Sequence, residues 1–215
     1  MDIIWHGHAC FEIKTAETTI LTDPFSENLG LPFPDAIEAD IVTVSHDHPH
    51  HNAVDRVGGT FKTVTTPGEY EIKEAFIIGA ALYPPAETAQ KMANPRNVVF
   101  FFELDGVTVC HMGDIRHVPT QRQLESFENV DILLLSVGNG KSLSATQASE
   151  AISLIEPSIV IPMHYYLPGI NIPLEPLEKF TKEMGIPTGE PLSKLKISAG
   201  SLPSETQVVI LAPQF

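Results

Sequence analysis

The sequence lacks features that define whole classes of protein. Its 215 residues include only two cysteines, Cys10 and Cys110, which is too few for a disulfide framework and favours a reducing compartment. Its most apolar runs, residues 98–102 and 132–135, fall far short of the roughly 20 residues that a membrane-spanning helix needs. The first residues show neither the basic nor the apolar stretch of a secretory signal. We therefore expect a cytoplasmic protein.

Positive charge is also scarce. Lysine and arginine number 13 against 27 aspartates and glutamates, which gives a net charge of −14 at pH 7. Because binding to nucleic-acid phosphates or to an anionic membrane needs a basic surface, we expect neither as a partner. Hydrophobic residues make up 43%, as in an ordinary globular protein, and we expect a single domain over residues 1–215. Whether the chain forms a homo-oligomer is left open.

Strand patterns dominate the first two thirds of the chain, and helical patterns come later. Short apolar or β-branched segments predict strands at residues 3–5, 10–13, 18–22, 41–44, 75–81, 98–104, 107–110, 132–135, 158–162 and 207–211. Apolar spacing predicts helices at residues 119–127, 144–155 and 173–184. Ser144 and Gln147 form a capping-box pattern, and the prolines within residues 83–97 predict a loop. These patterns together predict a layered α/β architecture with helices on the outer faces.

Histidine, by contrast, is abundant. The chain has nine histidines, and four of them fall within residues 46–51. Residues 45–52 read Ser-His-Asp-His-Pro-His-His-Asn, directly after the predicted buried strand at residues 41–44. Imidazole is the commonest zinc ligand, and a loop that leaves a strand end can turn several rings onto one ion. A solvated loop that happens to be rich in histidine is the alternative, and we favour a metal site.

Two more candidate ligands follow predicted strands. Asp114 lies just beyond the strand at residues 107–110, after Gly113, and His164 lies just beyond the strand at residues 158–162. In α/β proteins, site residues commonly follow the carboxyl ends of strands. Each of these residues alone would also fit a surface turn, but together with the histidine cluster they strengthen the interpretation as a metal site.

These motifs resemble those of the metallo-β-lactamase-fold hydrolases, whose pattern is His-x-His-x-Asp-His. His46, His48 and His51 fill its histidine positions, Asp114 matches the bridging aspartate of a Gly-Asp motif, and His164 matches a late histidine after a strand. The branch that the chain resembles most is the ascorbate-6-phosphate-lactonase-like group of zinc-dependent hydrolases. The further matching segments lie at residues 5–11, 23–24, 67–70 and 111–117, so that the resemblance runs over nearly the whole chain.

The resemblance implies a four-layer αββα sandwich. It also implies a metal-dependent hydrolase that uses a metal-bound hydroxide on a small-molecule substrate, which could be an ester, a lactone or a phosphodiester. The implied cofactor is Zn²⁺, as one or two ions, with Mn²⁺ or iron as alternatives. The implied metal ligands are His46, His48, His50, His51, Asp114 and His164.

Other roles also follow from the resemblance. Asp114 would act in catalysis by positioning the ions, and Asp23 is a candidate to orient a ligand histidine. The resemblance places His8 and His117 near the pocket. Each is either a catalytic proton donor to the leaving group or a structural histidine. The last two histidines, His6 and His111, are interpreted as structural.

Two departures from the family pattern concern the number of ions. His50 stands where the pattern has an aspartate, and a neutral imidazole offers less charge to hold two dications. A further histidine of the branch has no counterpart, because residues 83–85 read Tyr-Pro-Pro. Two alternatives to an active hydrolase therefore stay open. One is a non-catalytic metal-binding relative that acts as a scaffold or binding module, and the other is an iron-containing redox protein.

Overall fold

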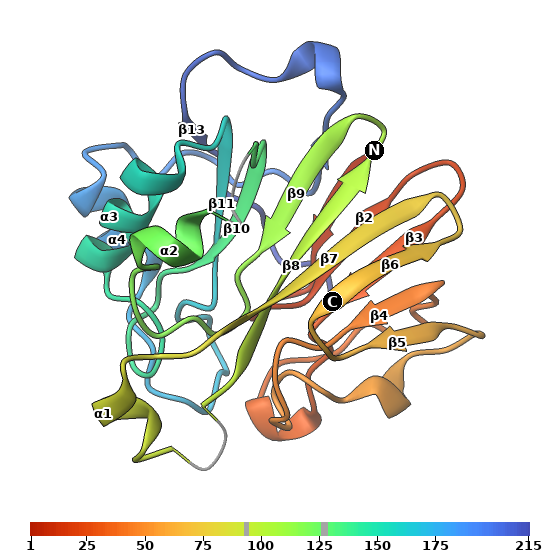
Figure 1. Cartoon of the computed structure of the whole chain (residues 1–215), viewed down its shortest axis with the longest axis horizontal. Helices are drawn as coiled ribbons and strands as arrows, with labels where there is room; N and C mark the ends of the chain where they lie inside the picture. Colours follow the sequence, from red (N-terminus) through yellow and green to blue (C-terminus); the bar gives the residue numbers. More distant parts are fainter. Residues whose placement is uncertain (93–94, 126–128) are drawn as a thin grey trace.

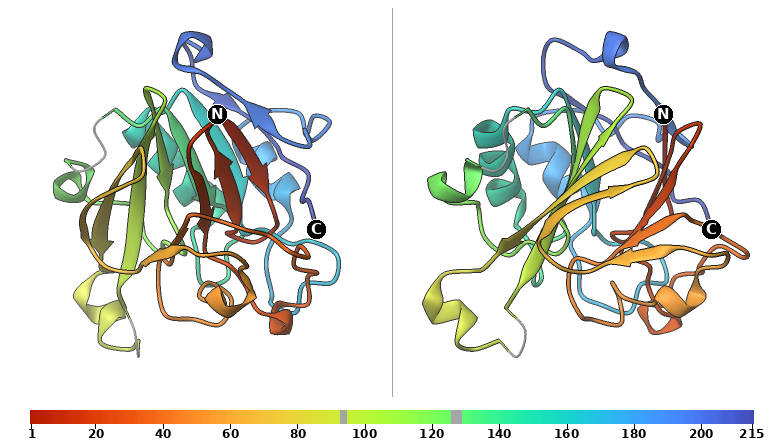
Figure 2. Two further views of the ribbon diagram at one scale, coloured as in Figure 1. Left: turned by 90° about the vertical axis from the view of Figure 1, so that its right-hand side faces the viewer. Right: turned by 45° about the vertical axis from the view of Figure 1, so that its right-hand side comes forward.

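The computed structural model describes residues 1–92, 95–125 and 129–215, and two β-sheets packed face to face form its centre (Figures 1 and 2). The strands of the first sheet lie in the order β12 (Leu195–Lys196), β1 (Asp2–Trp5), β2 (Phe11–Lys14), β3 (Thr19–Thr22), β4 (Ile41–Thr43) and β5 (Lys62–Val64). Those of the second lie in the order β13 (Gln207–Val208), β11 (Ile159–Met163), β10 (Ile132–Ser136), β9 (Val107–His111), β8 (Asn97–Leu104), β7 (Ala75–Leu82) and β6 (Gly68–Ile72). The C-terminal part of the chain thus contributes a strand to each sheet, β12 to the first and β13 to the second.

Most of the strands that site residues follow belong to parallel pairs. β3, β4 and β5 are parallel to one another, and so are β9, β10, β11 and β13. The remaining pairs are antiparallel, including the β8–β9 hairpin that turns at Asp105 and Gly106. Carboxyl ends of parallel strands meet at one edge of a sheet, so the loops after β9 and β11 start at the same edge of the second sheet.

Side chains that alternate along the strands divide the core into two parts. Ile20 and Ile41 point between the two sheets, where Trp5, Phe11 and Phe100 are fully buried. Their neighbours on β3 and β4 belong to a second cluster on the opposite face of the first sheet. This alternation with a period of two residues is what a sheet with apolar contacts on both faces requires.

The outer layers of the sandwich differ from each other. α3 (Ala145–Ile155) and α4 (Leu177–Glu183) cover the outer face of the second sheet, with the short α2 (Gln121–Leu124) beside them (Figure 1). On the first sheet, loop residues between 24 and 39, with a single 3-10 turn at Glu27–Leu29, cover the outer face with Phe25, Leu29 and Phe33. The predicted sandwich is confirmed, and among the described residues its fourth layer consists of this loop segment.

Most predicted elements are present, with shifted ends. The predicted helix at residues 173–184 begins only at Leu177, because Glu175 instead donates its backbone N–H to Gly138 (2.7 Å) and accepts from Tyr166 (2.9 Å). α2 is shorter than the prediction for residues 119–127, of which residues 126 and 127 lie outside the described part of the chain. The segment predicted as a loop contains the short α1 (Ala86–Ala89).

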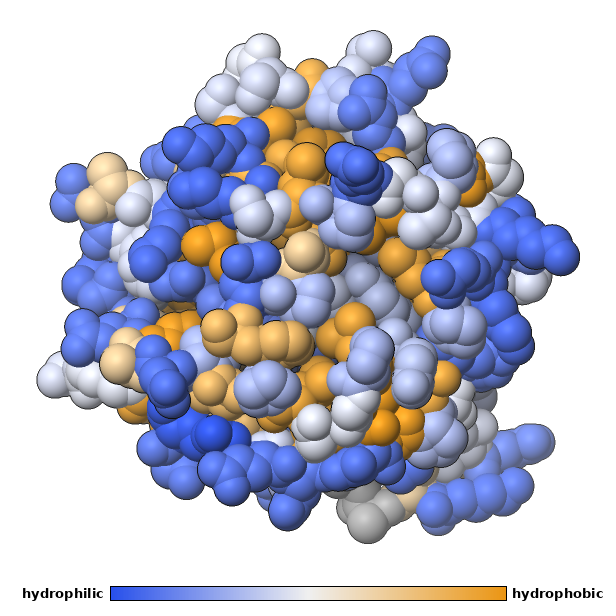
Figure 3. Space-filling model, turned by 180° about the vertical axis from the view of Figure 1, so that it is seen from behind, coloured by the Kyte–Doolittle hydropathy of each residue, from blue (hydrophilic) through white to orange (hydrophobic). Residues whose placement is uncertain are grey.

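Three strands, β5, β6 and β12, lie outside the predicted set. β5 and β6 are edge strands with polar, largely exposed side chains, and β12 has two residues, so their pattern carries little signal. Figure 3 shows apolar side chains in the central part of the rear face with hydrophilic ones around them. Among the described residues, no helix is long and apolar enough to cross a membrane.

The Ser144→Ala variant tests the sequence signal that begins α3. The Ser144 hydroxyl accepts from the backbone N–H of Gln147 (3.3 Å), and the Gln147 side chain accepts from the Ser144 backbone (3.1 Å). We expect the variant to lose about 1 kcal/mol of unfolding free energy in urea titrations. Ser153→Ala, on the exposed side of the same helix, should change it by less than about 0.5 kcal/mol. Equal effects of the two substitutions would contradict the role of the cap.

Candidate metal centre

The candidate ligands line one cavity at the carboxyl ends of the strands. The cavity has a volume of about 400 Å³, and all six predicted metal ligands contribute to its wall. His8, which follows β1, lines it as well. His117 does not; its Nε2 lies 3.3 Å from the Gln123 side chain, and the residue borders a small neighbouring depression. The structure therefore brings together every predicted site residue except His117.

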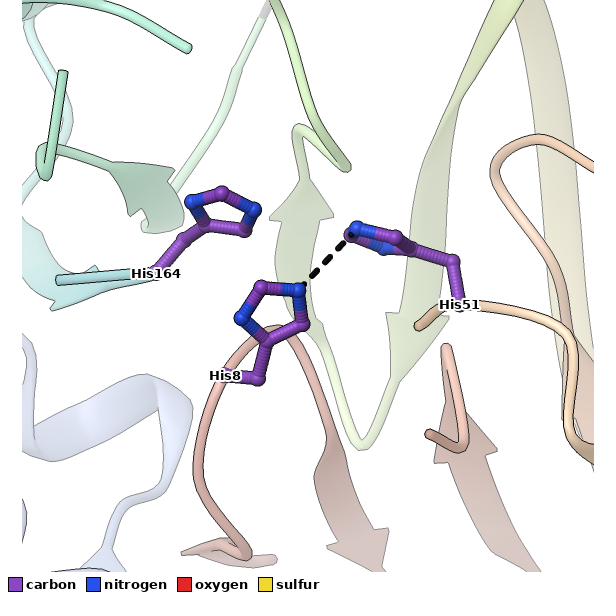
Figure 4. Close-up of side chains that lie close together, drawn as sticks. All are labelled: His8, His51 and His164. Carbon is purple, nitrogen blue, oxygen red and sulfur yellow. Dashed lines mark hydrogen bonds between the residues drawn. The ribbon is translucent and has the colours of Figure 1, made fainter. Parts of the chain in front are cut away.

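His8, His51 and His164 form a buried cluster in the cavity wall (Figure 4). The Nε2 atoms of His8 and His51 are 3.2 Å apart, and the rings of His8 and His164 have centroids 4.0 Å apart. Two nitrogens bound to one tetrahedral zinc ion at 2.0–2.1 Å are about 3.4 Å apart, so this spacing fits two ligands of a single ion. The donor set, three imidazoles facing a cavity, is that of a catalytic zinc site with a position open for water.

The backbone at two of these histidines is unusual. His8 and His164 have φ angles of +51° and +56°, in the left-handed region that non-glycine residues rarely adopt. The backbone N–H of His164 donates to the carbonyl of His8 (3.0 Å), and this bond joins the loops that follow β1 and β11. The resemblance gives His8 either a catalytic or a structural role. Its place after a strand, as for Asp114 and His164, is the signal that could have marked it as a ligand candidate.

Asp23 holds His51 from the side opposite the cavity. Its carboxylate is fully buried and accepts from the His51 ring Nδ1 (2.8 Å), from the Ser45 backbone N–H (2.7 Å) and from the Ser45 hydroxyl. With Nδ1 protonated, Nε2 of His51 keeps a lone pair toward the cavity, which is the usual carboxylate–histidine–metal arrangement. Burial raises the pKa of Asp23, and the nearby His111 and Ser45 act in the opposite direction. Asp23 thus lies where the predicted orienting role requires it.

Burial also controls the protonation of the cluster. It lowers the pKa of His8 and of His51 well below the usual value, and the neighbouring histidines add to this effect. It lowers the pKa of His164 as well, although Asp114 opposes the shift. Imidazoles that stay neutral offer their lone pairs to a cation without competition from protons.

The remaining loop histidines lie nearer the mouth of the cavity. The rings of His48 and His50 are 4.7 Å apart, and the His50 backbone N–H donates to Nδ1 of His48 (3.2 Å). Within the described residues, neither of them belongs to a group of three side chains whose ligand atoms all lie within 4.8 Å of one another. A second such group, Asp23, His46 and His51, exists, but its carboxylate is already used by Ser45 and His51.

Asp114 forms an ion pair with Arg116. One carboxylate oxygen accepts from the Arg116 guanidinium (3.0 Å), and the other is buried without a hydrogen-bond partner, 3.8 Å from Nε2 of His164. Gly113 has φ +61°, and a Cβ there would lie 2.5 Å from the Asn97 side chain and 2.6 Å from that of Ser45. Neighbouring side chains therefore approach the backbone at Gly113 too closely for any residue other than glycine. Nothing in the motif itself singles out Arg116.

His6 and His111 lie outside the cavity wall. Nε2 of His111 donates to the Ala9 carbonyl (2.9 Å), and Nδ1 of His6 donates to the Gln214 carbonyl (2.6 Å). Both rings therefore bind main-chain carbonyl groups, which is what a structural role requires.

Comparisons with known proteins point to one family. A family model described as "Beta-lactamase superfamily domain" matches residues 2–164. A UPF0173 protein of Pyrococcus abyssi is 28% identical, covering 77% of this chain and 83% of the relative. A UPF0173 metal-dependent hydrolase of Methanopyrus kandleri is 27% identical, covering 86% and 94%. The crystal structure of a candidate zinc-dependent hydrolase of the metallo-β-lactamase superfamily from Thermotoga maritima is 33% identical, with a TM-score of 0.80 and coverage of 98% and 97%.

The buried neutral histidines predict an acid-sensitive fold in the metal-free protein. Unfolding returns their pKa to about 6.5, so the unfolded chain binds more protons and stability falls as the pH drops below about 6.5. Each such imidazole adds up to about 1.4 kcal/mol per pH unit to the slope of the unfolding free energy against pH. We expect His51→Gln to flatten the slope by about this amount in urea unfolding between about pH 6.5 and 5.5. An unchanged slope would contradict the assignment.

Asp23→Asn tests the orientation of His51. An amide cannot replace the carboxylate that fixes the ring, and we expect zinc affinity to fall about 10- to 100-fold in competition titrations with a chromophoric chelator. Glu12→Gln is the matched control, because Glu12 is also a buried carboxylate beside a histidine, His6, but lies away from the cavity. A similar loss of affinity in both variants would mean that Asp23 acts only through general stability.

Proposed function

The chain belongs to the β-lactamase superfamily and is a metal-dependent hydrolase, and from this premise we propose that it hydrolyses a small-molecule ester, lactone or phosphodiester with metal-activated water. The observation that carries the proposal is the buried cluster of three neutral imidazoles in the wall of an open cavity. A bound zinc ion would supply an activated water and polarise a substrate oxygen. Its ligands would be His8, His51 and His164.

The surrounding side chains support this chemistry. Asp23 keeps the lone pair of His51 directed at the ion, and the unpartnered oxygen of Asp114 is placed to accept a proton or hydrogen bond from water beside His164. Because Ser45 holds Asp23 and Arg116 holds Asp114, both carboxylates are fixed before substrate arrives.

The size and wall of the cavity favour a small substrate. A volume of about 400 Å³ is in the range of small-molecule sites, and one wall is apolar, formed by Ile172, Pro173 and Leu174. The net charge of −14 argues against nucleic acid as the substrate. Cys10 and Cys110 are free, buried thiols, which is consistent with a reducing compartment, and we propose the cytoplasm.

Asp114→Asn tests the catalytic role. We expect untagged protein to contain zinc or manganese and to hydrolyse at least one member of a panel of lactones, esters and phosphodiesters. Loss of the carboxylate should reduce kcat by about 100-fold or more, because an amide is a poor proton acceptor. Asp47→Asn, on an exposed residue of the histidine loop after β4, should leave kcat unchanged.

Three outcomes would contradict the proposal. Protein free of metal after purification without chelators would remove its basis. Bound metal without hydrolysis of any panel member would favour the binding-module alternative. Bound iron with a visible absorption band would favour the redox alternative.

A further inference from the structure

The guanidinium of Arg116 lies beside the carboxylate of Asp114. The Arg116 side chain lies where the cavity and the neighbouring depression meet, since both are lined by Arg116, Asp114 and His46. One terminal nitrogen donates to Asp114 (3.0 Å), and the other lies 3.7 Å from the Met92 sulfur. The side chain is 23% exposed. Because arginine stays charged at all physiological pH values, this positive charge is permanent.

The ligand atoms near Arg116 do not complete a second metal site. On this side the wall includes His46, Asp114 and His117 beside Leu82 and Pro84, but in the described part of the chain these three side chains do not form a group whose ligand atoms all lie within 4.8 Å of one another. Nδ1 of His46 already lies 3.1 Å from the Ser45 hydroxyl. A dication placed between His46 and Asp114 would also lie beside the guanidinium, and the two cations would repel each other.

The half of the cavity opposite Arg116 contains the buried imidazoles. There the three imidazoles of His8, His51 and His164 converge, buried, and the carboxylate contacts of this cluster are those of Asp23 with His51 (2.8 Å) and of Asp114 with His164 (3.8 Å). One half of the cavity therefore has a complete set of neutral ligands for an ion, and the other half has a fixed organic cation.

We propose that the protein works with a single metal ion, held by His8, His51 and His164, and that the Arg116 guanidinium replaces the second metal ion at Asp114. This inference rests on the proposed function, because it assigns separate roles to the ligand histidines and to Arg116 in the same cavity. A guanidinium has five N–H donors, and two of its nitrogens already make the contacts with Asp114 and Met92. The donors that remain would bind the substrate oxygen on which negative charge develops, a task that the second ion performs in two-metal sites.

Metal stoichiometry tests the inference without reference to activity. Untagged protein is stripped with chelator and titrated with zinc against a chromophoric competitor. We expect one ion per chain for the wild type and for Arg116→Lys, which keeps the charge. Arg116→Met has similar length and no charge, so it frees one oxygen of Asp114 beside His46, and we expect it to bind a second, weaker ion. Two ions in the wild type, or a single ion in Arg116→Met, would overturn the proposal.

The position of the single ion is tested separately, so that the inference does not depend on how well an Arg116 variant folds. His8→Gln should lower zinc affinity at least tenfold, whereas His48→Gln should change it less than threefold. The opposite order would overturn the assignment. A wild type that binds one ion but hydrolyses nothing would contradict the proposed function and leave this inference standing. A hydrolase that binds two ions would do the reverse.

Discussion

The buried carboxylate of Asp23 is the interaction on which the centre depends. It has no exposure to water, and its charge is balanced by donors from the Ser45 backbone, the Ser45 hydroxyl and the His51 ring. Removing one donor would leave a buried charge only partly satisfied, which costs far more than the average hydrogen bond contributes. The end of β3, the loop after β4 and the central ligand histidine are therefore held as one unit.

This unit extends into the second sheet. The Ser45 carbonyl accepts from the backbone N–H of Val98 (2.8 Å), and the Ser45 side chain packs where Gly113 has no side chain. The second link is the bond between the His164 backbone N–H and the His8 carbonyl. The centre thus draws its ligands from both sheets, and any relative sliding of the sheets would separate His8 and His51 from Asp114. A rigid double-sheet core is what makes a site of this kind precise.

Much of this arrangement could be predicted from the sequence because the decisive signals are local. Continuous apolar segments mark the buried strands, Ser144 and Gln147 mark the start of α3, and the histidine cluster marks the edge where the ligands gather. The rest depends on tertiary contacts. The first residues of the predicted helix at 173–184 bond to Gly138 instead, and the pairing of Arg116 with Asp114 comes from the backbone path after Gly113. Periodicity and motif spacing do not indicate such contacts.

The left-handed backbone conformation at the site has a consequence for the substitutions that the protein can accept there. Asp23 shares this conformation with His8 and His164, at φ +38°, and each such residue costs about 1–3 kcal/mol unless its surroundings impose it. Glycine would relieve the strain at all three positions while deleting a ligand or its support. The presence of titratable side chains at these three turns of this chain indicates that the chemistry of the centre, and not backbone preference, sets their identity.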